Sequence, residues 1–100
     1  MNINKAQKDG KVTFTLDGRL DTTSSPQLQD VLIPAFDSAK QVELDFASLS
    51  YVSSAGLRVL LLGEKTARTK GGTMTLINVS QDIKEVFEMT GFSDVLKIIG

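Results

Sequence analysis

Two adjacent serines, Ser53 and Ser54, are the residues of this sequence with the clearest potential for chemistry. They precede an apolar-rich stretch from Ala55 to about Thr69, which predicts a helix that begins directly after them. The first backbone N–H groups of a helix lack partners within it, and serine hydroxyls commonly accept hydrogen bonds from them. The same N–H groups and the positive end of the helix dipole also favour an attached phosphate. The pair therefore has two possible roles, as an N-cap of the helix or as a site of phosphorylation.

The composition excludes most catalytic mechanisms. The 100 residues include no His and no Cys, which removes the commonest general base, the commonest metal ligand and thiol nucleophiles. Asp21 and Asp45 are isolated carboxylates with ordinary structural explanations, and no glycine-rich phosphate loop is present. We therefore expect a protein that binds a partner, without metal or cofactor, and not an α/β enzyme that holds a phosphate at a helix start. Lys plus Arg number 11 and Asp plus Glu 12, so the net charge of -1 gives no sign of nucleic-acid binding.

Alternating apolar residues predict the strands that must position the serines. Val12, Phe14 and Leu16 alternate with polar residues over 11–16, and a weaker strand over 3–7 is expected to form a hairpin with this one. The pair Asp17-Gly18 is expected to close the second strand. Further strands are predicted over 42–46 and 73–78, and 95–99 is expected to be a last short strand or a helical tail.

Serine caps and glycine stops predict three helices. Ser25 followed by Pro26 indicates the start of the first, and Pro34 predicts a kink or an early end near Ile33. The second helix follows the serine pair and ends at Gly71-Gly72, and the third runs from a cap at Ser80 to Gly91. One face of the second helix is suited to close packing on a sheet, since it carries Gly56, Leu60, Gly63 and Ala67.

These elements predict a single α/β domain over residues 1–100. Strand-helix-strand crossovers favour a mixed, mostly parallel sheet of four to five strands with helices packed on it. The N-terminus has no apolar run typical of a signal peptide, and the longest apolar run, 59–62, is too short to span a bilayer. We expect a cytoplasmic protein without membrane insertion.

The segment from Asp45 to Leu61 resembles the signature of the anti-sigma-factor antagonists of the STAS family. The matching residues are Asp45, Leu49, Tyr51, Val52, Ser54, Ala55, Gly56 and Leu57. The resemblance extends to the loop 17–21, to Gly71-Gly72 and to the segment 89–92, and so covers nearly the whole chain. The family usually has Asp where this sequence has Ser53, so a carboxylate beside the candidate acceptor is missing.

The resemblance implies a partner switch. An unmodified antagonist binds an anti-sigma factor, typically a serine kinase of the histidine-kinase-like ATPase type, and so frees the sigma factor. The kinase phosphorylates the antagonist, which is then released, and a phosphatase resets it. Carried over to this sequence, the acceptor is Ser54, with Ser53 as the second choice.

The residues predicted to contact the partner lie in the loop after the second strand and at the start of the second helix. They are Asp21, Thr22, Thr23, Ser53, Ser54, Gly56 and Arg58. Asp21, Thr22 and Thr23 would also be expected in an ordinary polar turn without a binding role. Arg58 would likewise be expected as an ordinary solvent-exposed charge on a helix. A constitutive STAS subunit of a transporter-associated or stressosome-like assembly, without a phosphoswitch, remains the alternative function.

Overall fold

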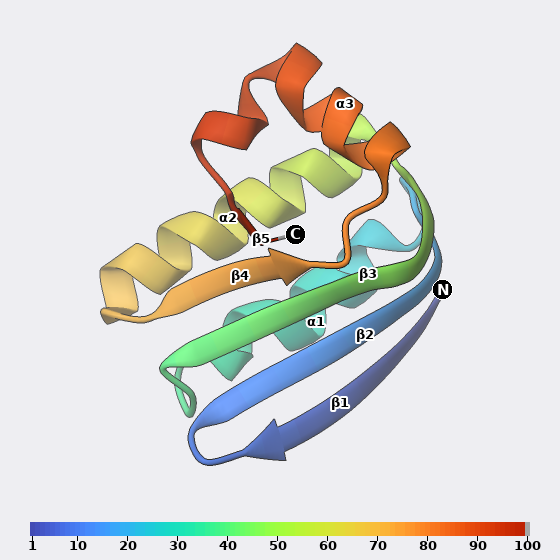
Figure 1. Cartoon of the computed structure of the whole chain (residues 1–100). Helices are drawn as coiled ribbons and strands as arrows, with labels where there is room; N and C mark the ends of the chain where they lie inside the picture. The colour runs from blue at the N-terminus through green and yellow to red at the C-terminus, as the bar shows by residue number, and fades with distance from the viewer. Residues whose placement is uncertain (100) are drawn as a thin grey trace.

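Strands and helices alternate in the order that the sequence predicts (Figure 1). The computed structural model describes residues 1–99. Its elements are β1 (Asn2–Lys8), β2 (Lys11–Leu20), α1 (Ser25–Ala35), β3 (Gln41–Val52), α2 (Ser54–Lys70), β4 (Thr73–Ile77), α3 (Gln81–Thr90), a short 3-10 helix (Phe92–Asp94) and β5 (Lys97–Ile99).

The five strands form one sheet in the order β1-β2-β3-β4-β5. The β1-β2 hairpin is antiparallel, whereas β2, β3, β4 and β5 are parallel to their neighbours. Each parallel pair is joined by a helical crossover, because parallel strands cannot be linked by a tight turn. The predicted fold class, a mixed and mostly parallel sheet with packed helices, is confirmed.

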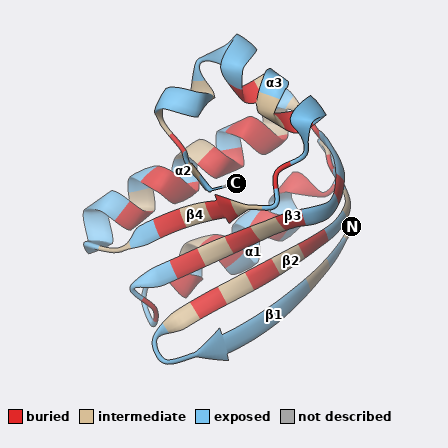
Figure 2. Ribbon diagram, in the orientation of Figure 1, coloured by how far each residue is buried: buried red, intermediate tan, exposed pale blue. Residues whose placement is uncertain are grey.

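The core lies between one face of the sheet and the helices α1 and α2 (Figure 1). Val12, Phe14 and Leu16 on β2 are each no more than 1% exposed, and Figure 2 shows buried residues alternating with more exposed ones along β2 and β3. The opposite face of the sheet is polar, and Lys11 Nζ lies 3.0 Å from Glu43 Oε2 there. This alternation is typical of a sheet with only one covered face.

The face of α2 that was expected to pack closely is buried along its whole length. Its members are Gly56, Leu60, Gly63 and Ala67. A Cβ on Gly63 would lie 2.7 Å from Met74 Sδ and 2.8 Å from Leu32 Cδ2, so the missing side chain lets α2 approach β4 and α1. The helix ends at Gly71, whose φ of +71° is the left-handed conformation typical of a glycine C-cap.

Two strands extend beyond their predicted ends. Asp17-Gly18 does not close β2, which continues to Leu20, and β3 runs to Val52 and not to Phe46. The register between the two strands shifts after Thr15 and again after Gly18, and each shift places one extra residue in β3, which breaks the alternation of β3 but not that of β2. Pairing by backbone hydrogen bonds therefore continues where the sequence pattern of β3 is lost.

The predicted limits of α1 are also wrong. The N-cap is Ser24 and not Ser25, which is the first helical residue, and the Ser24 side chain does not cap the helix. The helix passes through Pro34 and ends at Ala35, two residues later than expected. Pro34 has no N–H to donate to the Asp30 carbonyl four residues earlier, and because Asp30 is exposed, water can hydrogen-bond to that carbonyl instead.

The C-terminal segment closes the core beside β3 and β4. Phe87 of α3 is fully buried, and its ring centroid lies 6.3 Å from that of Phe46 on β3. The last segment, predicted as a strand or a helical tail, is the strand β5, which pairs with β4. None of the helices within residues 1–99 combines the length and apolar character that crossing a bilayer requires.

Candidate functional site

The two serines at the start of α2 have different environments. Ser53 is the N-cap, and its Oγ accepts a hydrogen bond of 3.2 Å from the Gly56 N–H. Ser54 is the first helical residue, its side chain is exposed, and its hydroxyl has no hydrogen-bond partner within residues 1–99. The hydroxyl of Ser53 therefore serves the helix, whereas that of Ser54 is free for chemistry or binding.

The start of α2 is held tightly against the end of β2. The Ser53 N–H donates to the Leu20 carbonyl over 2.8 Å, since Leu20 and Val52 are paired at the ends of their parallel strands. Gly56 is buried, and a Cβ there would lie 2.7 Å from Leu20 Cγ. Of the predicted partner contacts, Gly56 thus holds the site in place through this close approach and offers no side chain to a partner.

A tight polar turn follows β2 and lies beside the serines. Asp21 Oδ1 accepts hydrogen bonds from the backbone N–H groups of Thr23 at 3.1 Å and Ser24 at 3.0 Å. The Ser24 hydroxyl is buried and donates to the Arg19 carbonyl at 2.6 Å. The side chains of Thr22 and Thr23 remain exposed at the surface of this turn. Asp21 therefore orders the turn that presents both threonines.

Hydrogen bonding also changes the acidity of Asp21. The backbone N–H of Ser24 is the largest influence and holds the pKa of the Asp21 carboxyl below its ordinary value. Partial desolvation opposes this effect, while the Ser24 hydroxyl, the Thr23 N–H and the charge of Arg19 reinforce it. Each donor favours the ionised carboxylate, so Asp21 is a fixed negative charge in the turn at neutral pH.

A contact between Arg19 and Tyr51, close to the serines, was not predicted from the sequence. The guanidinium carbon of Arg19 lies 4.3 Å from the centroid of the Tyr51 ring, and both side chains are exposed. The two residues are partners in the β2-β3 register, and both come after its shifts. Both belong to segments that carried the family resemblance, and that resemblance was the only signal that could have indicated them.

A groove beside the serines, which we call the α1-α2 groove, separates the first halves of these two helices. Its volume is about 280 Å³, and its lining includes Thr22, Pro26, Gln29, Ala55, Arg58 and Leu62. Arg58 is exposed and forms no ion pair within residues 1–99. The loop and helix residues predicted to contact a partner thus meet at one end of the sheet.

The site carries more positive than negative charge. Two exposed arginines lie near the start of α2: Arg19 is next to Leu20, whose carbonyl accepts from the Ser53 N–H, and Arg58 is four residues after Ser54. The first turn of α2 contains no acidic residue. The positive end of the α2 dipole adds to both charges, and Asp21 is the neighbouring carboxylate that opposes them. Residues 1–99 contain no group of acidic side chains arranged to hold a metal ion. An anion or a modified serine suits this site better than a cation does.

The chain resembles known proteins over nearly its whole length. The family model described as the STAS domain matches residues 2–99. A candidate anti-sigma factor antagonist of Bordetella bronchiseptica, BtrV, is 33% identical over 99 residues, covering 98% of this chain and 85% of BtrV. The anti-sigma-B factor antagonist of Bacillus subtilis is 26% identical over 98 residues, covering 98% of this chain and 90% of its own.

Solved structures share the fold at lower sequence identity. An anti-sigma factor antagonist-like protein of Thermotoga maritima superposes with a TM-score of 0.88 at 16% identity, covering 96% of this chain and 84% of its own. The phosphorylated form of the Bacillus cell fate determinant SpoIIAA has a TM-score of 0.78 at 20% identity, covering 99% and 92%. Matches to the family model and to the curated relatives extend over nearly all of residues 1–99, including the serine pair and the turn at Asp21. The chain therefore belongs to the STAS domain family and, within it, to the anti-sigma factor antagonists.

Proposed function

We propose that this chain binds an anti-sigma factor that is also a serine kinase, and that phosphorylation of Ser54 ends the binding. The unmodified chain removes the anti-sigma factor from its sigma factor, which is then free. A phosphatase restores the unmodified form, and all of these partners act in the cytoplasm. Membership of the anti-sigma factor antagonists supports the choice of partner. The observation that supports the switch is the exposed hydroxyl of Ser54, which has no hydrogen-bond partner within residues 1–99.

The local geometry favours Ser54 over Ser53 as the acceptor. The Ser53 oxygen already caps α2, so its modification would displace the hydrogen bond from the Gly56 N–H. The Ser54 hydroxyl faces solvent at the first helical residue, and a kinase can reach it without disturbing that cap. Replacement of the usual family Asp by Ser53 retains the cap, because both residue types are strong N-caps.

The reaction transfers the γ-phosphoryl group of ATP to the Ser54 oxygen. The hydroxyl loses its proton, an oxygen–phosphorus bond forms, and ADP leaves with the bridging oxygen. The product adds a charge of about -1.5 to -2 at neutral pH, which is large beside the chain's net charge of -1. The positive end of α2 stabilises this charge, so modification need not unfold the helix. Release of the partner then follows from the charge and bulk of the phosphate at the interface.

The partner surface consists of the turn after β2 and the first turn of α2. The turn contributes Asp21, Thr22 and Thr23 to this surface. The helix contributes Ser53, Ser54 and Arg58, and Gly56 lies beneath them. The geometry supports this grouping, because Leu20 and Ser53 are joined by a backbone hydrogen bond. The partner is a protein, since the balanced charge of the chain suits neither nucleic acid nor insertion into a membrane.

The test is intact-mass analysis after incubation with ATP and a candidate anti-sigma factor kinase from the same organism. Wild type and Ser53→Ala should gain the mass of one phosphate, while Ser54→Ala should gain none. Binding of the kinase should be lost when wild type is phosphorylated. If Ser54→Ala still gains the mass of one phosphate and Ser53→Ala does not, the acceptor is Ser53 and not Ser54. Stable binding without any phosphate transfer would support the constitutive-subunit alternative.

A further inference from the structure

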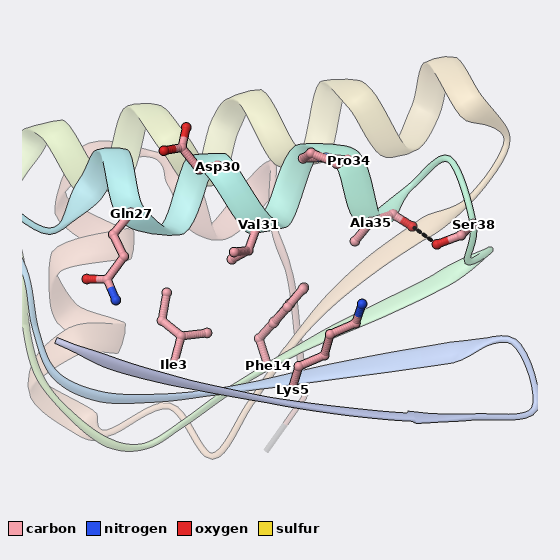
Figure 3. A pocket seen from close by; sticks show the side chains of 9 residues that line it. All are labelled: Ile3, Lys5, Phe14, Gln27, Asp30, Val31, Pro34, Ala35 and Ser38. Carbon is pink, nitrogen blue, oxygen red and sulfur yellow. Dashed lines mark hydrogen bonds between the residues drawn. The ribbon is translucent and has the colours of Figure 1, made fainter.

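Two grooves flank α1, one on each side. The α1-α2 groove lies beside the serines, and a larger groove of about 410 Å³, which we call the α1-β1 groove, lies between α1 and the edge strand. Figure 3 shows Val31 of α1 facing Ile3 and Phe14 across the α1-β1 groove. Leu62 of α2 lines the α1-α2 groove instead. Leu62 and Val31 are each 39% exposed, so each groove presents one unusually exposed aliphatic side chain.

The two grooves differ in charge. The α1-α2 groove is lined by a single charged side chain, the cation Arg58, and by no carboxylate. The α1-β1 groove is lined by both Lys5 and Asp30, so opposite charges offset each other there. Only the α1-α2 groove therefore has a net charge that would select a partner of opposite sign.

We propose that the α1-α2 groove receives an aliphatic side chain of the anti-sigma partner while Arg58 binds a neighbouring carboxylate of that partner. This inference rests on the proposed function and names the chemistry by which that site recognises its partner. Leu62, Ala55 and Pro26 supply the apolar lining, and Arg58 supplies the charge beside it. Arginine is among the residue types that most often dominate interface affinity, and the exposed Leu62 beside it offers apolar surface that a partner would bury.

The position of Arg58 also explains how a phosphate on Ser54 would act on the groove. Residues four apart on a helix lie on the same face, so Ser54 and Arg58 are neighbours on α2. A phosphate and an arginine form strong, often bidentate hydrogen bonds. Phosphorylated Ser54 therefore draws Arg58 away from the partner carboxylate and repels that carboxylate at the same time.

The experiment measures the dissociation constant between the unphosphorylated chain and its candidate kinase by titration calorimetry. Leu62→Ala should weaken binding about tenfold or more, whereas the matched control Val31→Ala should change it less than about twofold. Arg58→Gln should weaken binding about fivefold to tenfold and flatten its dependence on salt, since a charge contact is lost. Thermal unfolding of each variant checks that the fold is retained, which the exposure of all three side chains favours.

The outcomes separate this inference from the proposed function. If wild type does not bind the kinase, the proposed function fails and the inference falls with it. If wild type binds but Leu62→Ala and Val31→Ala weaken binding equally, the groove assignment alone is overturned. An unchanged salt dependence in Arg58→Gln would overturn the role of the arginine. Self-association of the purified chain that Leu62→Ala abolishes would place a second copy in the groove and contradict the proposal.

Discussion

Replacing Ser53 and Ser54 one at a time should separate the serine that caps α2 from the serine that we propose as the phosphate acceptor. In Ser53→Ala the Gly56 N–H loses its acceptor, which lies 3.2 Å away in wild type. Loss of an N-cap of this kind costs about 0.5–2 kcal/mol of unfolding free energy. Gly56 is buried, so its freed N–H cannot readily reach water, and we expect a loss of about 1–2 kcal/mol. For a chain of this size each kcal/mol lowers Tm by about 4–8 °C.

Ser54→Ala should behave differently, because its hydroxyl has no partner within residues 1–99. Its unfolding free energy should stay within about 0.5 kcal/mol of wild type. Urea unfolding followed by circular dichroism measures both variants, and Ser53→Asp is the matched control. A carboxylate at Ser53 also caps α2 and faces the positive end of its dipole, so this control should be as stable as wild type or more so. Equal losses in Ser53→Ala and Ser54→Ala, or none in the first, would refute the reasoning.

Two further predictions concern the elements that hold the serines. Gly56→Ala should lower the free energy of unfolding, measured with urea, by about 1 kcal/mol or more. A Cβ there would lie 2.7 Å from the fully buried Leu20, and this overpacking costs more than the higher helix propensity of alanine gains. A variant as stable as wild type would contradict this. Asp21 should make the stability of the fold depend on pH in acid, because folding lowers the pKa of its carboxyl below the ordinary value of 3.8. The ionised carboxylate therefore stabilises the folded state above pH 3.8, and this stabilisation is lost as the pH falls through the lower pKa of the folded state. Between about pH 5 and pH 2, the Tm of wild type should fall more steeply than that of Asp21→Asn, and parallel curves would remove Asp21 as the cause.

The order and type of the elements could be predicted because their patterns are local. Alternating apolar residues marked β2 and the start of β3, and Ser80 and Gly91 marked the ends of α3. The end of β3 could not be predicted, because the register shifts break its alternation, whereas the end of β2 was misplaced because Asp17-Gly18 resembles a turn although the strand continues to Leu20. The start of α1 was misplaced for a similar reason: the Ser24 hydroxyl bonds to Arg19 across the turn and does not cap the helix.

Some contacts around the serines follow from the order of the strands, and others do not. The turn that begins at Asp21 and the start of α2 at Ser53 lie close together because each follows the end of one of two neighbouring parallel strands. The contact between Arg19 and Tyr51 depends on the register of β2 and β3 after both shifts, and no local pattern encodes that register. The difference between the two serines was equally hidden, since it depends on which hydroxyl accepts the bond from Gly56.

The absent side chain at Gly56 has a consequence for how Ser54 can be recognised. With α2 resting directly on Leu20, the serine is fixed to the folded core and cannot swing out as a serine on a flexible loop does. The proposed kinase of Ser54 would therefore have to fit its active site to the shape of the whole domain and not to an extended peptide. A short peptide of the same sequence would lack that shape, so unfolded or newly made chains would escape modification until the domain has folded.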